Sequence, residues 1–192
     1  MHVIFSLPGA GLLALSLVLF APAHADTKPH SHGRLALDVA VDATSITISM
    51  ESPLDNFLGF ERAPRTDAER KGVAALVNRL NAAESLFAID PQSGCTLSKV
   101  DLQSAALGLG NNSASSGATA QGHKNKAEGQ AHADIDATFV FACTHADQAR
   151  FIDVKLIGAF KRITAIDVQL ATAQGQFKRI LTRSASRLGW GK

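Results

Sequence analysis

The recurrence of apolar residues at every second position in three segments is the feature that most constrains the fold of this chain. Apolar side chains occupy every second position in residues 34–41 and 46–51, which are separated by the short Asp42-Ala43-Thr44 segment, and again in residues 133–143. Side chains of a β-strand point alternately to opposite faces, so each segment predicts a strand with one buried face. The first two segments predict an antiparallel hairpin.

The residues at its N-terminus predict one helix. Thr66-Asp67-Ala68-Glu69 is a capping box, in which the Thr66 hydroxyl and the Glu69 carboxylate can each accept a hydrogen bond from a free backbone N–H. Apolar residues then recur at helical spacing. The sequence therefore predicts one amphipathic helix from Asp67 to about Asn81.

The remaining elements are short and lack βαβ alternation. Residues 52–64 hold two prolines and a glycine and predict an ordered loop without regular structure, and residues 156–163 predict a short helical link. Further strands are expected at residues 86–89, 95–102, 150–156, 165–170 and 176–182. This pattern predicts an α+β fold, mainly an antiparallel β-sheet with one well-capped amphipathic helix.

The N-terminal segment predicts export. Residues 12–20 are almost wholly apolar and are followed by Ala23-His24-Ala25, a small-x-small pattern typical of signal peptidase sites. We expect residues 1–25 to be a signal peptide cut after Ala25, which leaves residues 26–192 as a single soluble domain. A membrane anchor is the alternative, but the apolar run is too short to span a bilayer. The net charge of +2 gives no argument for nucleic-acid binding.

The two cysteines predict a disulfide. An exported chain meets an oxidising compartment, where an even number of cysteines favours pairing, here of Cys95 with Cys143. A catalytic thiol is the alternative, but neither cysteine lies in a C-x-x-C pair or near an obvious base.

A low-complexity segment lies between the two cysteines. Residues 108–131 consist mainly of Gly, Ser, Ala, Asn and Gln, with no large apolar side chain after Leu109. Such a segment cannot bury enough surface to offset its ordering entropy. We therefore expect a long flexible loop at 108–131.

Four residues form a candidate metal site. His30 and His32 precede the first strand and are two residues apart, so in an extended chain both imidazoles point the same way. His132 and Asp134 repeat this spacing at the start of a later strand. If the two strand starts lie at the same edge of the sheet, the four side chains suit Zn(II) and could accept Cu(II) or Ni(II). A solvated N-terminal tail is the alternative for the first pair.

Enzymatic motifs are missing from the sequence. It has no G-x-S-x-G elbow, no P-loop, no G-x-G-x-x-G and no H-E-x-x-H. Asp134 and Asp136 could be imagined as an acid/base pair, but carboxylates on one exposed strand face are usually solvated. The chain is therefore not expected to be an enzyme.

Several of these motifs together resemble the ZrgA-like family of bacterial periplasmic zinc-uptake proteins. The most specific is a G-F-E-x-A-P stretch. The motifs are His30-Ser31-His32-Gly33 before a strand, residues 56–64 before a capped helix, the cysteines flanking a low-complexity loop, and Leu188-Gly189-Trp190 near the C-terminus.

The resemblance implies zinc binding in the periplasm and a part in zinc import. Family members commonly carry a central loop rich in His and Asp, whereas this loop keeps only His123, and Arg62 stands where the family typically has His. The most that carries over is a single zinc site built from His30, His32, His132 and Asp134.

The sequence thus predicts a periplasmic zinc-binding accessory protein that assists zinc uptake or sequestration, with a zinc importer component as its partner. Zinc ligands are neutral imidazoles, so affinity should fall as the pH drops through about 6.5. The alternative is a periplasmic interaction or structural protein without metal binding.

Overall fold

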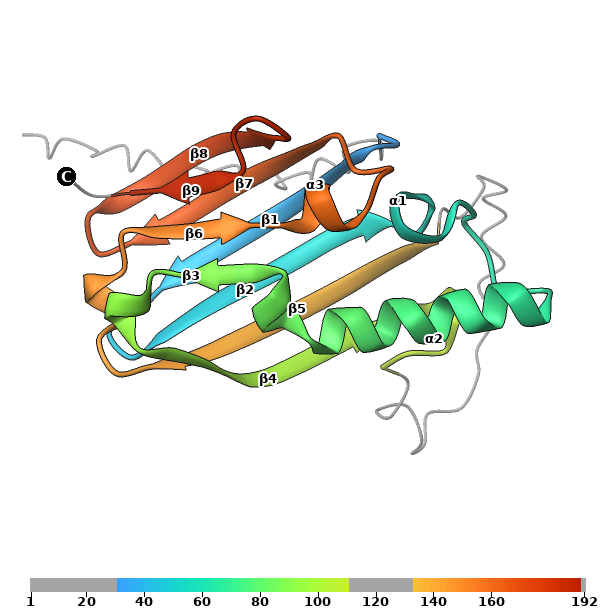
Figure 1. Cartoon of the computed structure of the whole chain (residues 1–192), viewed down its shortest axis with the longest axis horizontal. Helices are drawn as coiled ribbons and strands as arrows, with labels where there is room; N and C mark the ends of the chain where they lie inside the picture. Colours follow the sequence, from blue (N-terminus) through green and yellow to red (C-terminus); the bar gives the residue numbers. More distant parts are fainter. Residues whose placement is uncertain (1–30, 111–132, 191–192) are drawn as a thin grey trace, which may run out of the picture.

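A computed structural model describes residues 31–110 and 133–190 (Figure 1). The predicted signal peptide, His30, His132 and all but the first three residues of the predicted 108–131 loop lie outside these described residues. No helix in the described part is long and apolar enough to cross a membrane.

The described chain forms two β-sheets and three α-helices. A six-stranded sheet has the order β4-β5-β2-β1-β7-β8, and a three-stranded sheet has the order β3-β6-β9. The strands are β1 (Arg34–Val41), β2 (Ser45–Pro53), β3 (Phe87–Ile89), β4 (Cys95–Gln103), β5 (Asp134–Cys143), β6 (Phe151–Val154), β7 (Ala165–Thr172), β8 (Gly175–Thr182) and β9 (Arg187–Gly189). The helices are α1 (Asp55–Leu58), α2 (Asp67–Asn81) and α3 (Leu156–Ala159). Short 3-10 helices lie at Ala83–Ser85, Pro91–Ser93, Ala105–Leu107 and Ala146–Gln148.

The alternating segments form the centre of the large sheet. β1 and β2 pair as the predicted antiparallel hairpin, with Val39 opposite Ile48. β5 pairs antiparallel with β2, with Phe139 opposite Ile48. All three of these side chains are at most 3 % exposed, because every second residue of each strand faces the second layer. The predicted α+β fold with mainly antiparallel strands is confirmed.

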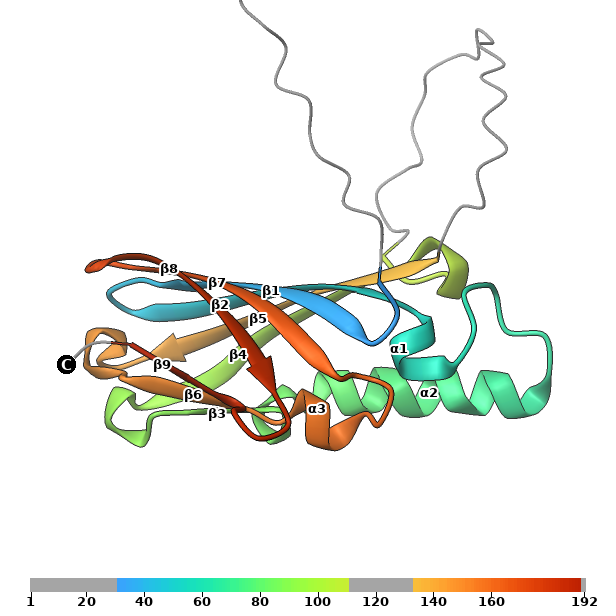
Figure 2. The same ribbon diagram turned by 90° about the horizontal axis from the view of Figure 1, so that it is seen from above.

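A second layer covers one face of the large sheet. Figure 2 shows β3, β6 and β9 on that face, with α2 and α3 at one end of the small sheet. Phe87 of β3 packs against Phe139 of β5, with ring centroids 5.1 Å apart, so the two sheets share one core. On the opposite face of the large sheet, none of the described helices or strands forms a covering layer.

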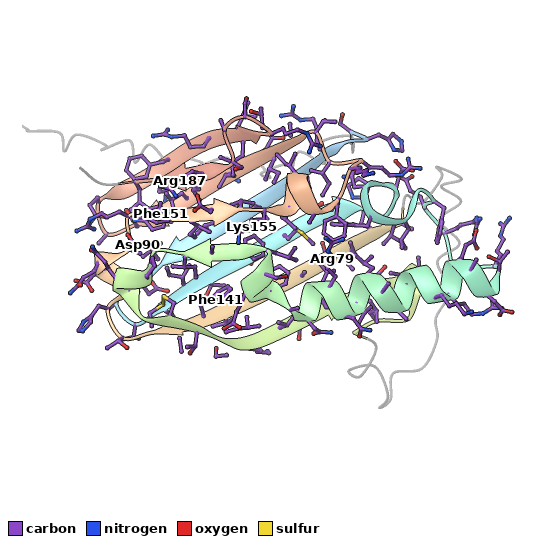
Figure 3. All side chains as sticks on the ribbon, in the orientation of Figure 1. Arg79, Asp90, Phe141, Phe151, Lys155 and Arg187 are labelled. Carbon is purple, nitrogen blue, oxygen red and sulfur yellow. A yellow bond between two sulfur atoms is a disulfide. The ribbon has the colours of Figure 1, made fainter. Side chains whose placement is uncertain are left out.

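The small sheet carries a charged pair on its own surface. Arg187 of β9 donates two hydrogen bonds to Asp153 of β6, at 2.6 and 2.8 Å, and its guanidinium lies 4.0 Å from the centre of the Phe151 ring. Figure 3 shows Arg187 beside Phe151 on this sheet. The hydrogen bonds from Arg187 hold the pKa of the Asp153 carboxyl below its usual range.

The predicted helix is confirmed as α2, and both bonds of its capping box are present. The Thr66 hydroxyl accepts from the Glu69 N–H at 3.1 Å, and the Glu69 carboxylate accepts from the Thr66 N–H at 3.2 Å. Arg62 donates two further hydrogen bonds to Glu69, at 2.7 and 3.0 Å. Together with the Arg65 N–H they lower the pKa of Glu69 to about 2.

The predicted disulfide joins Cys95 and Cys143, which are opposite each other where β4 begins and β5 ends. The pair therefore links two neighbouring strands of the large sheet. A disulfide of this kind is typical of proteins exported to oxidising compartments.

Three features differ from the sequence prediction. Residues 52–64 contain the one-turn helix α1 rather than only irregular chain. The short strands β3, β6 and β9 form their own sheet, and β9 was not expected at all. β1 also pairs in parallel with β7, from Arg34 opposite Ala165 to Ala40 opposite Ala171. Each of these three features depends on contacts between distant segments, which the local periodicity of the sequence does not encode.

Candidate metal site

Three strand ends meet at one end of the large sheet, beside α1 (Figure 1). Ala36 of β1 pairs with Glu51 of β2, so extending this ladder by two residues places Arg34 beside Pro53. On its other side Pro53 pairs with Asp134, the first residue of β5. Neighbouring strands lie about 4.8 Å apart, so the starts of β1 and β5 are about 10 Å apart at the backbone. The two strand starts therefore lie at the same end of the sheet, as the predicted site requires.

His32 occupies a tight turn immediately before β1. The Arg34 N–H donates to the Ser31 carbonyl at 3.0 Å, which makes His32 and Gly33 the central residues of a β-turn. Gly33 has a φ of 79°, a left-handed conformation that favours glycine. A Cβ there would lie only 3.0 Å from the Thr164 hydroxyl oxygen. The glycine of the H-S-H-G motif thus fixes the course of the backbone next to His32.

Asn56 of α1 fastens this turn to the rest of the molecule. Its side-chain oxygen accepts from the Gly33 N–H at 2.7 Å, and its amide nitrogen donates to the Arg34 carbonyl at 2.7 Å and to the Ser52 hydroxyl at 3.0 Å. Asn56 is 1 % exposed, so these bonds form away from water. From the other side, the Thr164 N–H and hydroxyl donate to the Gly33 carbonyl at 2.8 and 2.9 Å. The His32 backbone is therefore held on two sides.

The His32 imidazole faces two carboxylates. Its Nδ1 lies 3.2 Å from Oδ2 of Asp55 and 3.8 Å from Oε1 of Glu61. The other oxygen of Asp55, Oδ1, lies 3.6 Å from Nη1 of Arg162. The side chain of His32 is 66 % exposed, whereas those of Asp55 and Glu61 are 21 % and 18 % exposed. The two acids thus form the base of a small polar cluster, and the imidazole lies above them, open to solvent.

Of the four predicted ligands, His32 and Asp134 are among the described residues, and His30 and His132 lie outside them. Asp134 is connected to the α1 region through its neighbour, because the Leu54 N–H donates to the Ala133 carbonyl at 2.9 Å. Within residues 31–110 and 133–190, no three His, Cys, Asp or Glu side chains are arranged to hold a metal ion.

The sequence prediction missed two acidic residues beside His32. Asp55 and Glu61 belong to the segment 52–64, for which the sequence predicts an ordered loop without regular structure. The structure brings both carboxylates to His32, because Phe57 packs edge-on against Phe160 with ring centroids 4.8 Å apart and Leu54 is fully buried. The sequence feature that could have revealed these two acids is the segment 52–64 itself, which has apolar and acidic residues directly before a capped helix.

Comparison with protein-family models identifies a family. Residues 29–190 match a family model described as ZrgA family zinc uptake protein, so the match spans both the His32 cluster and the disulfide. No curated protein matches the chain significantly.

Proposed function

Because the chain belongs to the ZrgA family of zinc uptake proteins, we propose that it is a periplasmic accessory protein that binds zinc. It sequesters the ion or passes it to a component of a zinc importer, and it carries out no catalysis of its own. Zinc is its cargo. The binding site lies at the end of the large sheet next to α1.

The observation that carries this proposal is the position of His32 beside Asp55 and Glu61, at the end of the sheet where Asp134 begins β5. Imidazole nitrogen and carboxylate oxygen are ordinary zinc ligands in proteins. A metal-binding imidazole also commonly has a carboxylate on its second nitrogen. His30 and His132 precede Ser31 and Ala133 directly in the sequence, so both are candidates for further ligands.

Isothermal titration of the disulfide-intact protein, residues 26–192, with Zn(II) tests the proposal. We expect a single site, and we expect the double variant His30→Ala/His32→Ala to lose most of the affinity, because the carboxylates and one imidazole that remain make a poor zinc site. The matched control is His123→Ala in the low-complexity segment, which should change the affinity little. Absence of zinc binding by the unmodified protein would refute the function.

A variant that lacks residues 108–131 separates two locations for the metal. Unchanged affinity in this deletion, together with loss in the double histidine variant, supports a site at the end of the sheet. Loss on deletion with unchanged affinity in the double variant would instead place zinc on the low-complexity segment.

A different class of function is favoured by the uncovered face of the large sheet. A shallow depression of about 500 Å³ lies there, lined by residues of β1, β2, β7 and β8, among them Asp38, Ser49 and Lys178. A periplasmic interaction or structural protein without metal binding would use such a face. The zinc titration distinguishes the two functions directly.

A further inference from the structure

We propose that Asp55 is a positioning residue for His32: it holds the imidazole in the Nδ1–H form, so that Nε2 is the nitrogen presented to the metal. The part of this inference that concerns zinc rests on the proposed function. The part that concerns the imidazole does not, because the position of its proton can be measured in the metal-free protein.

The contact between the two side chains decides which nitrogen carries the proton. Nδ1 of His32 lies 3.2 Å from Oδ2 of Asp55, within hydrogen-bond distance. A carboxylate only accepts hydrogen bonds, so the facing nitrogen must be the donor. In a neutral imidazole the proton on Nδ1 leaves a lone pair on Nε2. The second carboxylate, Glu61, lies 3.8 Å from the same nitrogen and reinforces this choice.

Asp55 also forms an ion pair on its other side. Nη1 of Arg162 lies 3.6 Å from its Oδ1, the oxygen that does not face the imidazole. Gly59 leaves room for this approach: a Cβ at that position would lie 2.7 Å from Nη2 of Arg162, and the guanidinium would have to shift. Gly59 also ends α1 with a φ of 79°. The order Arg162, Asp55, His32 therefore forms a chain of charge-assisted contacts across three segments.

The same helix also positions the backbone of His32. Asp55 contacts the imidazole, and the next residue, Asn56, accepts from the N–H of Gly33. One turn of helix thus restrains both the ring and the peptide that carries it. The His32 side chain remains 66 % exposed, so these restraints leave the imidazole accessible to an ion. Carboxylates that orient metal-binding imidazoles in this way commonly improve affinity by about 10–100-fold.

A directly coordinating Asp55 is the competing arrangement, and it makes the opposite prediction. Because Oδ2 of Asp55 faces Nδ1, a metal bound by both would lie on the Nδ1 side, and the proton would move to Nε2. The nitrogen that carries the proton after zinc has bound therefore distinguishes an orienting carboxylate from a ligating one.

Two-bond ¹H–¹⁵N NMR correlation spectra of the histidine rings, recorded at pH 8 on the protein of residues 26–192, provide the test. The His32 signals are identified by their absence in His32→Gln. We expect the Nδ1–H form in the metal-free protein, a shift toward the Nε2–H form in Asp55→Ala, and zinc on Nε2 after addition of Zn(II). Asp38→Ala is the matched control: it removes one exposed carboxylate from β1 and should leave the His32 signals unchanged.

In the titration, Asp55→Ala should bind zinc about 10–100-fold more weakly than Asp38→Ala. The inference is overturned by a predominant Nε2–H form in the unmodified protein, by zinc on Nδ1, or by His32 signals in Asp55→Ala that match those of the unmodified protein. The spectrum of the unmodified protein decides the first point even if Asp55→Ala does not fold. Absence of zinc binding would refute the proposed function and leave the tautomer result standing.

Discussion

Replacement of Asn56 by alanine should be among the most destabilising single changes near the cluster. Asn56 is 1 % exposed, and its side-chain amide joins the turn before β1 to α1 and to the end of β2. Alanine removes all of these hydrogen bonds without introducing a clash. The Gly33 N–H and the Arg34 carbonyl then lose their Asn56 partner, in a place that the rest of the fold keeps largely closed to water.

The magnitude follows from the groups that lose this partner. The Gly33 N–H and the Arg34 carbonyl each bond Asn56 at 2.7 Å. A buried polar group left without a partner costs about 1–3 kcal/mol, so these two groups cost about 2–6 kcal/mol together. The Ser52 hydroxyl loses less, because it still donates to the Pro53 carbonyl at 3.2 Å. We therefore expect the free energy of unfolding to fall by about 3 kcal/mol.

Urea unfolding of the disulfide-intact protein measures this change as a lower midpoint at an unchanged m-value. The matched control is Asn81→Ala. Asn81 is an exposed asparagine of α2 that donates to the Val77 carbonyl, and its replacement should alter the free energy of unfolding by less than about 0.5 kcal/mol. A loss below about 1 kcal/mol for Asn56→Ala would show that water or a shifted backbone satisfies the turn, and the argument for a rigid His32 backbone would fail.

Three further predictions concern stability. Replacing Cys95 and Cys143 by serine opens a link across 48 residues of sequence, which should lower the free energy of unfolding by about 4 kcal/mol in the chain-entropy model; an unchanged urea midpoint would contradict this. Gly33→Ala places a side chain at a φ of 79°, which should cost at least about 1–2 kcal/mol in the same assay; a neutral result would mean that the turn can relax. Hydrogen bonds from Arg62 and from the Arg65 and Thr66 N–H groups lower the pKa of Glu69 to about 2, so the stabilising effect of the Glu69 carboxylate is present above about pH 4.5 and is lost as the pH falls toward 2. The melting temperatures of Glu69→Gln and the unmodified protein should therefore converge over that range, and a constant difference would refute the assignment.

The elements that the sequence predicted well are those whose evidence is local. The β1–β2 hairpin, β5 and α2 each carry their own periodicity or capping residues, and the structure places them within a residue or two of the predicted bounds. The disulfide could be predicted because only one pairing of two cysteines exists.

The elements that it missed depend on distant partners. β9 has three residues and gains its hydrogen bonds only by pairing with β6, so no window of sequence displays it. The parallel pairing of β1 with β7 joins residues more than 120 positions apart, such as Leu37 and Val168. Such contacts follow from how the two layers pack, which periodicity cannot specify.

The residues of the candidate site show the same division between local evidence and contacts with distant segments. His32 and Asp134 were singled out by spacing, and the condition for a shared site, that their strand starts lie at one end of the sheet, is met by the pairing of β1, β2 and β5. Asp55 and Glu61 were missed as neighbours of His32 because 23 residues separate Asp55 from His32 and their proximity depends on α1. A glycine, an asparagine and two acids within seven residues were the unused evidence.

Arg62 shows how a departure from the family resemblance can leave the cluster at His32 intact. The side chains of the neighbouring residues Glu61 and Arg62 contact different partners. The Glu61 carboxylate lies 3.8 Å from His32 Nδ1. The Arg62 guanidinium instead donates to Glu69 at the start of α2 and lies 4.8 Å from the centre of the Phe60 ring. Arg62 therefore strengthens the cap of α2 and takes no part in the contacts of His32 with Asp55 and Glu61.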